Sequence, residues 1–167
     1  TGFFYDSWSV DCPKYRHLCL EGFWPVIVGA ADPEQAGYII ERHMMNEQEF
    51  LSRHPVPTVS LQDSLYEKRM WRGPAWNSMT MWAARGCMRY GRYEEAGRLL
   101  EAALDGTSRI YSQTGCIWEF YDSLGGRPVQ VQRKPQTGFN MPCRDYLGHN
   151  PLHYMAGLWE ECRHAKR

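Results

Sequence analysis

The 167 residues are enough for one domain, and with 43% hydrophobic and 14% aromatic residues they can bury a sizeable core. Nineteen basic residues balance nineteen acidic ones, which argues against nucleic acid or an anionic membrane surface as a partner and favours a neutral ligand. No apolar run approaches the length of a membrane span. The chain starts at Thr1 without a leader, which we interpret as a cut.

A short helix is predicted over residues 23–29, and an amphipathic helix is predicted to begin after Asp32. Asp32 is a good N-cap, and Pro33 fits the first helical position. Apolar and aromatic side chains then recur at helical spacing at Ala36, Ile39, Ile40, His43 and Met44. This pattern is typical of an outer helix with one buried face.

Residues 77–90 are predicted to form an inner helix covered on most sides, because their apolar residues leave only a narrow polar edge. Residues 93–104 return to a single apolar stripe, with Glu94 and Arg98 one turn apart on the solvent side. The last helix is predicted to open with Asn150 as its cap and Pro151 in its first turn. Its apolar face would contain Leu152, Met155, Ala156, Trp159 and Cys162.

The segment between Asp105 and Asn150 contains six glycines and three prolines, which predicts an irregular loop throughout. Loops of this length in compact domains are usually functional. Enclosed and amphipathic helices that alternate between glycine-rich loops are typical of an α/α toroid. The sequence therefore predicts an all-α fold that forms part of such a toroid, with about five helices where a complete barrel has about twelve.

The stretch Trp71-Arg72-Gly73-Pro74-Ala75-Trp76 places two indoles and a guanidinium around a turn at a helix start. Flat apolar faces beside a fixed set of donors suit the CH faces and hydroxyl groups of a pyranose ring. The alternative is structural: both tryptophans pack the core at the end of the barrel, and Arg72 bonds loop carbonyls.

A second motif, residues 116–121, alternates so that Cys116, Trp118 and Phe120 would point one way and Ile117, Glu119 and Tyr121 the other. Glu119 could supply acid–base chemistry beside a sugar. The alternative is an edge strand on which Glu119 is an ordinary solvated group.

The tryptophan motif resembles the W-R-G-P-x-W signature of glycoside hydrolase family 63 and its bacterial relatives, which include mannosylglycerate and glucosylglycerate hydrolases. The resemblance extends in order through Phe23-Trp24-Pro25 and residues 31–36, 55–60 and 118–121, and so covers most of the chain. Trehalases are a poorer match. The resemblance implies that residues 1–167 are the C-terminal portion of one α/α-barrel catalytic domain. It also implies that the enzyme is an inverting hydrolase that acts on an α-glucoside or a related small α-glycoside.

The resemblance also implies roles for particular residues. Glu119 takes the place of the general base, and Trp71, Arg72, Trp76 and Tyr121 take places in the sugar subsite. The family's general acid lies in an upstream aspartate motif that no segment here resembles. Among the available carboxylates, none is assigned as the acid: Asp6, Asp11, Asp63, Asp122 and Asp145. Met70 stands where relatives often have an aromatic residue, so the sugar is left open.

No cofactor is expected. His149 and His153 lack the intervening glutamate of a zinc motif, and Gly125-Gly126 is not a phosphate-binding loop. Reduced thiols are favoured over disulfides, because the six cysteines show no paired spacing. The compartment is left open, with the cytoplasm weakly favoured.

Two other functions stay open, a sugar epimerase or isomerase on the same barrel type and a non-catalytic sugar-binding or interaction fragment. The expected partners are a carbohydrate and the missing N-terminal part of the barrel or a second copy, because the inner helix would otherwise expose an apolar wall.

Overall fold

The computed structural model describes residues 2–5 and 16–165. Its α-helices are α1 (Trp24–Val28), α2 (Pro33–Ile39), α3 (Asn77–Arg89), α4 (Tyr93–Thr114) and α5 (Leu152–His164). Short helical turns are η1 (Leu20–Phe23), η2 (Ile40–Met44), η3 (Met70–Arg72) and η4 (Pro128–Gln130). Within this described part of the chain, β pairing is limited to isolated bridges, so the predicted all-α fold is confirmed.

None of the helices in residues 2–5 and 16–165 has the length and apolarity needed to cross a membrane.

Helix α2 begins as the sequence predicts. The Asp32 side chain accepts a hydrogen bond from the Gln35 backbone N–H, the Gln35 side chain accepts one from the Asp32 N–H, and Pro33 occupies the first turn. This reciprocal capping satisfies two donors that a helix start would otherwise leave unpaired. The helix continues into the wider turns of η2, and Ala36, Ile39, Ile40 and Met44 of the predicted face are fully buried.

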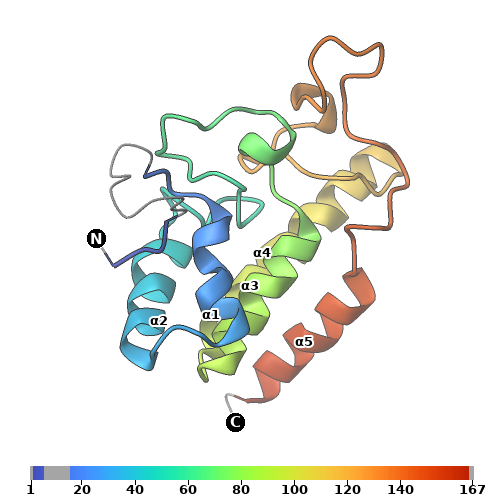
Figure 1. Ribbon diagram of the computed structural model, residues 1–167. Helices are drawn as coiled ribbons and strands as arrows, with labels where there is room; N and C mark the ends of the chain where they lie inside the picture. The colour runs from blue at the N-terminus through green and yellow to red at the C-terminus, as the bar shows by residue number, and fades with distance from the viewer. Residues whose placement is uncertain (1, 6–15, 166–167) are drawn as a thin grey trace.

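Helix α3 lies at the centre of the helical layer, packed against α1, α4 and α5 (Figure 1). Gly86 allows α1 to approach closely, because a Cβ there would lie 3.2 Å from the Ile27 Cα. The predicted inner helix is confirmed, but the expectation that it exposes an apolar wall is wrong. Its residues Met79, Trp82 and Met88 are half-buried, and the large exposed apolar side chains of the described residues lie on other segments.

Helix α4 is longer than predicted, because residues 105–114 continue the helix instead of forming a loop. Thr107 and Ile110 extend the apolar stripe of Leu99, Leu100 and Ala103 at helical spacing, and both are buried. The helix ends at Gly115, whose φ of 65° is a left-handed C-cap conformation that glycine adopts without strain.

Helix α5 starts at Leu152, with Pro151 in the N-cap position, and its buried face consists of Met155, Leu158 and Cys162. Two expectations are therefore wrong in detail. Leu158 takes the buried place expected of Ala156, and the Asn150 side chain does not cap the helix. Asn150 is instead 7% exposed, and its side-chain amide donates hydrogen bonds to the carbonyl oxygens of two loop residues, Trp118 and Tyr146.

The long loops lie together at the end of the helical layer where α3 begins and α4 ends (Figure 1). They comprise residues 45–76 before α3 and residues 115–151 between α4 and α5. Both predicted motifs are in these loops, so the fold places the tryptophans and Glu119 at one end of the helices.

Candidate active site

The two motifs are joined directly through their backbones. Ala75 and Tyr121 form an antiparallel bridge in which each N–H donates to the other's carbonyl oxygen at 2.9 Å. The side chains beside this bridge also meet, because the Trp76 and Phe120 ring centroids lie 4.9 Å apart. Segments more than forty residues apart in sequence therefore form one unit at the start of α3.

Glu119 is buried, with only 3% of the residue exposed. Its Oε2 accepts hydrogen bonds from the Arg133 Nε at 2.9 Å and from the Cys143 backbone N–H at 3.1 Å. The edge-strand interpretation is wrong, because residues 116–121 form bridges only at Trp118 and Tyr121 and all of them except Ile117 are buried. A buried carboxylate with two donors on one oxygen is held in a fixed orientation.

Trp71 and Trp76 stack face to face, with ring centroids 4.1 Å apart and planes 8° from parallel. Trp76 is 1% exposed and packs also against Phe120 and His149, whereas Trp71 is 41% exposed. The two indoles do not line a cavity side by side: Trp71 is the outer ring and Trp76 supports it from below.

The other two predicted sugar-binding residues have protein partners. Arg72 is half exposed, and its guanidinium lies 3.4 Å from a Glu67 carboxylate oxygen. The Tyr121 hydroxyl is buried, accepts a hydrogen bond from the Trp118 N–H at 3.2 Å and donates to Asn150 Oδ1 at 3.3 Å. Burial raises the pKa of Tyr121 to about 12, so the phenol stays neutral and holds this loop.

Two asparagines that the sequence analysis did not assign to the site connect it to the helices. Asn77, the first residue of α3, donates to Thr107 Oγ1 of α4 and to Asn150 Oδ1, both at 2.8 Å. Asn150 Nδ2 in turn donates to the carbonyl oxygens of Trp118 and Tyr146. The residue before Glu119 is thereby tied to α3 and α4. Asn77 directly follows the tryptophan motif, which was the one available signal.

His54 is the third side chain of this hydrogen-bond network, after Asn77 and Asn150. Its Nε2 lies 2.9 Å from Asn77 Oδ1, and its ring stacks on Tyr121 with centroids 4.4 Å apart. Because the Asn77 amide NH₂ already faces two acceptors, Oδ1 must accept, so Nε2 carries the proton. The Nδ1 atom is buried without a partner, against Gly106, where a Cβ would come within 2.7 Å of it.

The buried imidazole predicts a pH-dependent stability. Burial is the main cause that lowers the pKa of His54 from 6.5 to about 4. As pH falls from 6.5 toward 4, His54 binds a proton in the unfolded chain but not in the folded chain. The free energy of unfolding therefore decreases, by roughly 3 kcal/mol in total. Urea unfolding across this range should show a steeper decrease for the parent than for His54→Gln. Parallel curves for the two proteins would contradict the assignment.

Among the unassigned carboxylates, Asp63 and Asp122 already have partners within the described residues. Asp63 accepts hydrogen bonds from the Leu18 and Leu65 N–H groups and lies against His17. Burial alone would raise the pKa of Asp63, but these hydrogen bonds outweigh it and lower the pKa. Asp122 is buried and pairs with Lys68 at 2.8 Å. Asp145 is exposed, and Asp6 and Asp11 lie outside the described residues.

No cluster of three or more His, Cys, Asp or Glu side chains suited to a metal ion occurs in residues 2–5 and 16–165. His149 instead bonds the Ser78 hydroxyl through Nδ1 at 2.8 Å and packs edge-on against Trp76. Cys87, Cys116 and Cys143 are free thiols, and Cys12 lies outside the described residues.

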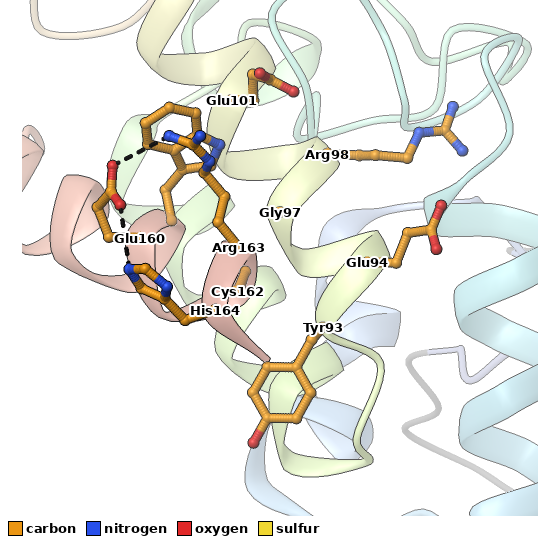
Figure 2. Close-up of a pocket in the computed structure, with 10 residues that line it drawn as sticks. Tyr93, Glu94, Gly97, Arg98, Glu101, Glu160, Cys162, Arg163 and His164 are labelled. Atoms are coloured by element: carbon orange, nitrogen blue, oxygen red, sulfur yellow. Dashed lines mark hydrogen bonds and ion pairs between the residues drawn. The ribbon is translucent and has the colours of Figure 1, made fainter. Parts of the chain in front are cut away.

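A groove of about 570 Å³ lies between α4 and α5, away from both motifs. Figure 2 shows that Glu160 pairs with Arg163 and His164 on its α5 side, while Arg98 and Glu94 extend from α4. The Arg163 guanidinium also lies 4.8 Å from the centre of the Trp159 ring. The Trp159 ring is therefore covered by a cation, and the groove lies away from both motifs, so this groove is not the predicted sugar site.

The geometry thus joins a buried carboxylate and a pair of stacked tryptophans on two bridged loops of an all-α domain. Residues 1–140 match the family model of the mannosylglycerate hydrolase MGH1-like glycoside hydrolase domain. The chain belongs to this family. Its predicted membership of the family 63 group is thereby confirmed, whereas its place as the C-terminal portion of the domain stays a prediction.

Solved structures from Thermus thermophilus are similar. An uncharacterized conserved protein shares 27% identity over 75% of this chain with a TM-score of 0.62. The GH63 mannosylglycerate hydrolase in complex with glucose shares 23% identity over 96% of this chain with a TM-score of 0.66. Its complex with Tris and D-glycerate shares 27% identity over 66%, with a TM-score of 0.58.

The aligned part amounts to 30%, 33% and 26% of those chains respectively, so this chain spans about a quarter to a third of their length. The agreement supports the predicted toroid as the fold of the whole domain. No match was found among curated proteins.

Proposed function

We propose that this chain forms part of the catalytic domain of an inverting glycoside hydrolase, with Glu119 as the general base. The observation that carries the proposal is the buried Glu119 carboxylate, held by Arg133 and Cys143 on one oxygen and joined by the Ala75–Tyr121 bridge to the tryptophan stack. A base must be fixed within reach of the water that attacks the sugar, and the two donors provide that orientation.

In the inverting mechanism a carboxylic acid protonates the leaving oxygen while the base activates water on the opposite face of the sugar. The two carboxyl groups are about 6.5 to 9.5 Å apart in such enzymes. The acid would come from the remainder of the domain, because the family's acid lies in an upstream aspartate motif that no segment here resembles. The exposed face of Trp71 would carry the apolar side of the sugar, with Trp76 beneath it.

The substrate we propose is an α-glucoside or a related small α-glycoside. One feature supports a small sugar: the tryptophan stack exposes the Trp71 indole, which offers a platform of about one ring. The similar Thermus enzyme is a mannosylglycerate hydrolase that was solved with glucose and with D-glycerate, which makes sugar glycerates the first substrates to test.

Proton NMR of the first product anomer tests this proposal. The full-length protein that carries these residues should release the β-anomer from an α-linked sugar glycerate, because direct attack by water inverts the anomeric carbon. The 167 residues alone should show no turnover, because general-acid assistance is missing. Release of the α-anomer would refute the inverting mechanism, and turnover by the isolated chain would refute an external acid.

A further inference from the structure

Arg133 reaches Glu119 from a loop that is itself anchored beside the tryptophan motif. Its neighbour Gln132 accepts a hydrogen bond from the Met70 N–H and donates its own N–H to the Lys68 carbonyl, both at 2.8 Å. Arg133 therefore follows a residue that is paired with the backbone leading into Trp71. Its side chain extends from there to the Glu119 carboxylate. The arginine is 28% exposed at the side chain, against 4% for Glu119.

The contacts divide the two carboxylate oxygens of Glu119 into different environments. Both the Arg133 Nε and the Cys143 N–H donate to Oε2, at 2.9 and 3.1 Å. The Glu119 N–H also donates to the Cys143 carbonyl at 2.9 Å, so the residue is fixed at both its backbone and its side chain. With Oε2 occupied by two donors, Oε1 is the oxygen available to a water molecule.

The charge on Glu119 also needs this partner. A carboxylate that is nearly inaccessible loses most of its hydration, and a guanidinium bonded to it restores part of that stabilisation. Two other ionisable groups lie nearby. One is the Cys143 thiol, and burial together with the Glu119 carboxylate raises its pKa. The other is Tyr146, which lies near Arg133. The Arg144 guanidinium lies over the Trp118 ring instead. Arg133 is thus the cation that contacts the carboxylate.

We infer that Arg133 is a positioning residue, which holds Glu119 through Oε2 so that Oε1 is directed at the attacking water. The inference rests on the proposed function, because it assigns Arg133 a task only if Glu119 is the base. Arg133 would contribute to turnover through Glu119 and would not contact the sugar.

Steady-state kinetics of the full-length protein on the sugar glycerate test the inference. Arg133→Gln should lower kcat by about 10- to 100-fold, because a small misplacement of a catalytic group has effects of this size, while KM stays within about threefold. Arg133→Lys, which keeps the charge but loses the guanidinium geometry, should recover part of the loss. The matched control is Lys134→Gln, which removes an exposed charge at the next residue and should behave as the parent.

A double-mutant cycle separates positioning from other roles. In a Glu119→Gln background, Arg133→Gln should lower kcat no further, because its effect passes through the carboxylate. An equal loss in both backgrounds, a raised KM at unchanged kcat, or a parent-like kcat would each overturn the inference. A melt near that of the parent excludes loss of folding as the cause. A Glu119→Gln protein as active as the parent would refute the proposed function itself, a result distinct from any Arg133 outcome.

Discussion

Replacing Glu119 with glutamine in the full-length protein should lower the turnover of an α-glycoside by several powers of ten. Glutamine has nearly the same shape but cannot take a proton from water, so the general base is lost. The folded structure should change little, because the glutamine oxygen can still accept from Arg133 and from the Cys143 N–H. Loss of the ionic part of these bonds is worth about 1 kcal/mol, which is visible as a small decrease in melting temperature.

Asp122→Asn is the matched control for this prediction. Asp122 is also buried, also lies beside Tyr121, and pairs with Lys68 at 2.8 Å, but no contact connects its carboxylate to Glu119 among the described residues. This variant should lower the melting temperature and keep turnover within about tenfold of the parent, since it weakens a structural ion pair. If Glu119→Gln keeps activity within tenfold as well, the base is another group.

Local rules predicted most of the helical framework. The capping box at Asp32, the proline that follows it and the apolar spacing through Met44 all depend on neighbours in sequence, and each is present in the structure. The error in α4 came from glycine. Gly106 was taken as a loop signal, yet it lies inside the helix because the His54 ring needs the space that a Cβ would fill. That need arises from a residue about fifty positions earlier.

The candidate site was predictable only as separate motifs. The tryptophans and Glu119 were found from composition, spacing and family resemblance, but their partners come from irregular loops. Arg133 has no periodic relation to Glu119, and its contact depends on how residues 127–146 fold back over residues 117–119. Asn150 was interpreted as a helix cap, the usual role of asparagine before a helix. Its amide is used by Trp118, Tyr146 and Asn77, which no local pattern encodes.

The stacked tryptophans give the second large expected effect, and the structure separates their roles. Trp76→Ala removes a ring that is 1% exposed and packs against Trp71, Phe120 and His149. Such a truncation leaves a cavity and typically lowers stability by about 3 to 5 kcal/mol, or on the order of ten degrees in melting temperature. Binding of a monosaccharide inhibitor should weaken too, because Trp71 loses the surface against which it stacks.

Trp71→Ala should have the opposite balance. Its ring is 41% exposed, so its truncation lowers stability by roughly 1 kcal/mol but removes the face offered to the sugar. Trp76→Phe is the control, since it keeps a smaller aromatic ring as the support and removes the Trp76 Nε1 donor, which is buried without a partner. Calorimetry of inhibitor binding together with thermal melts distinguishes these cases. If Trp71→Ala binds the inhibitor as the parent does, the stack is part of the core only, and the sugar subsite lies elsewhere in the domain.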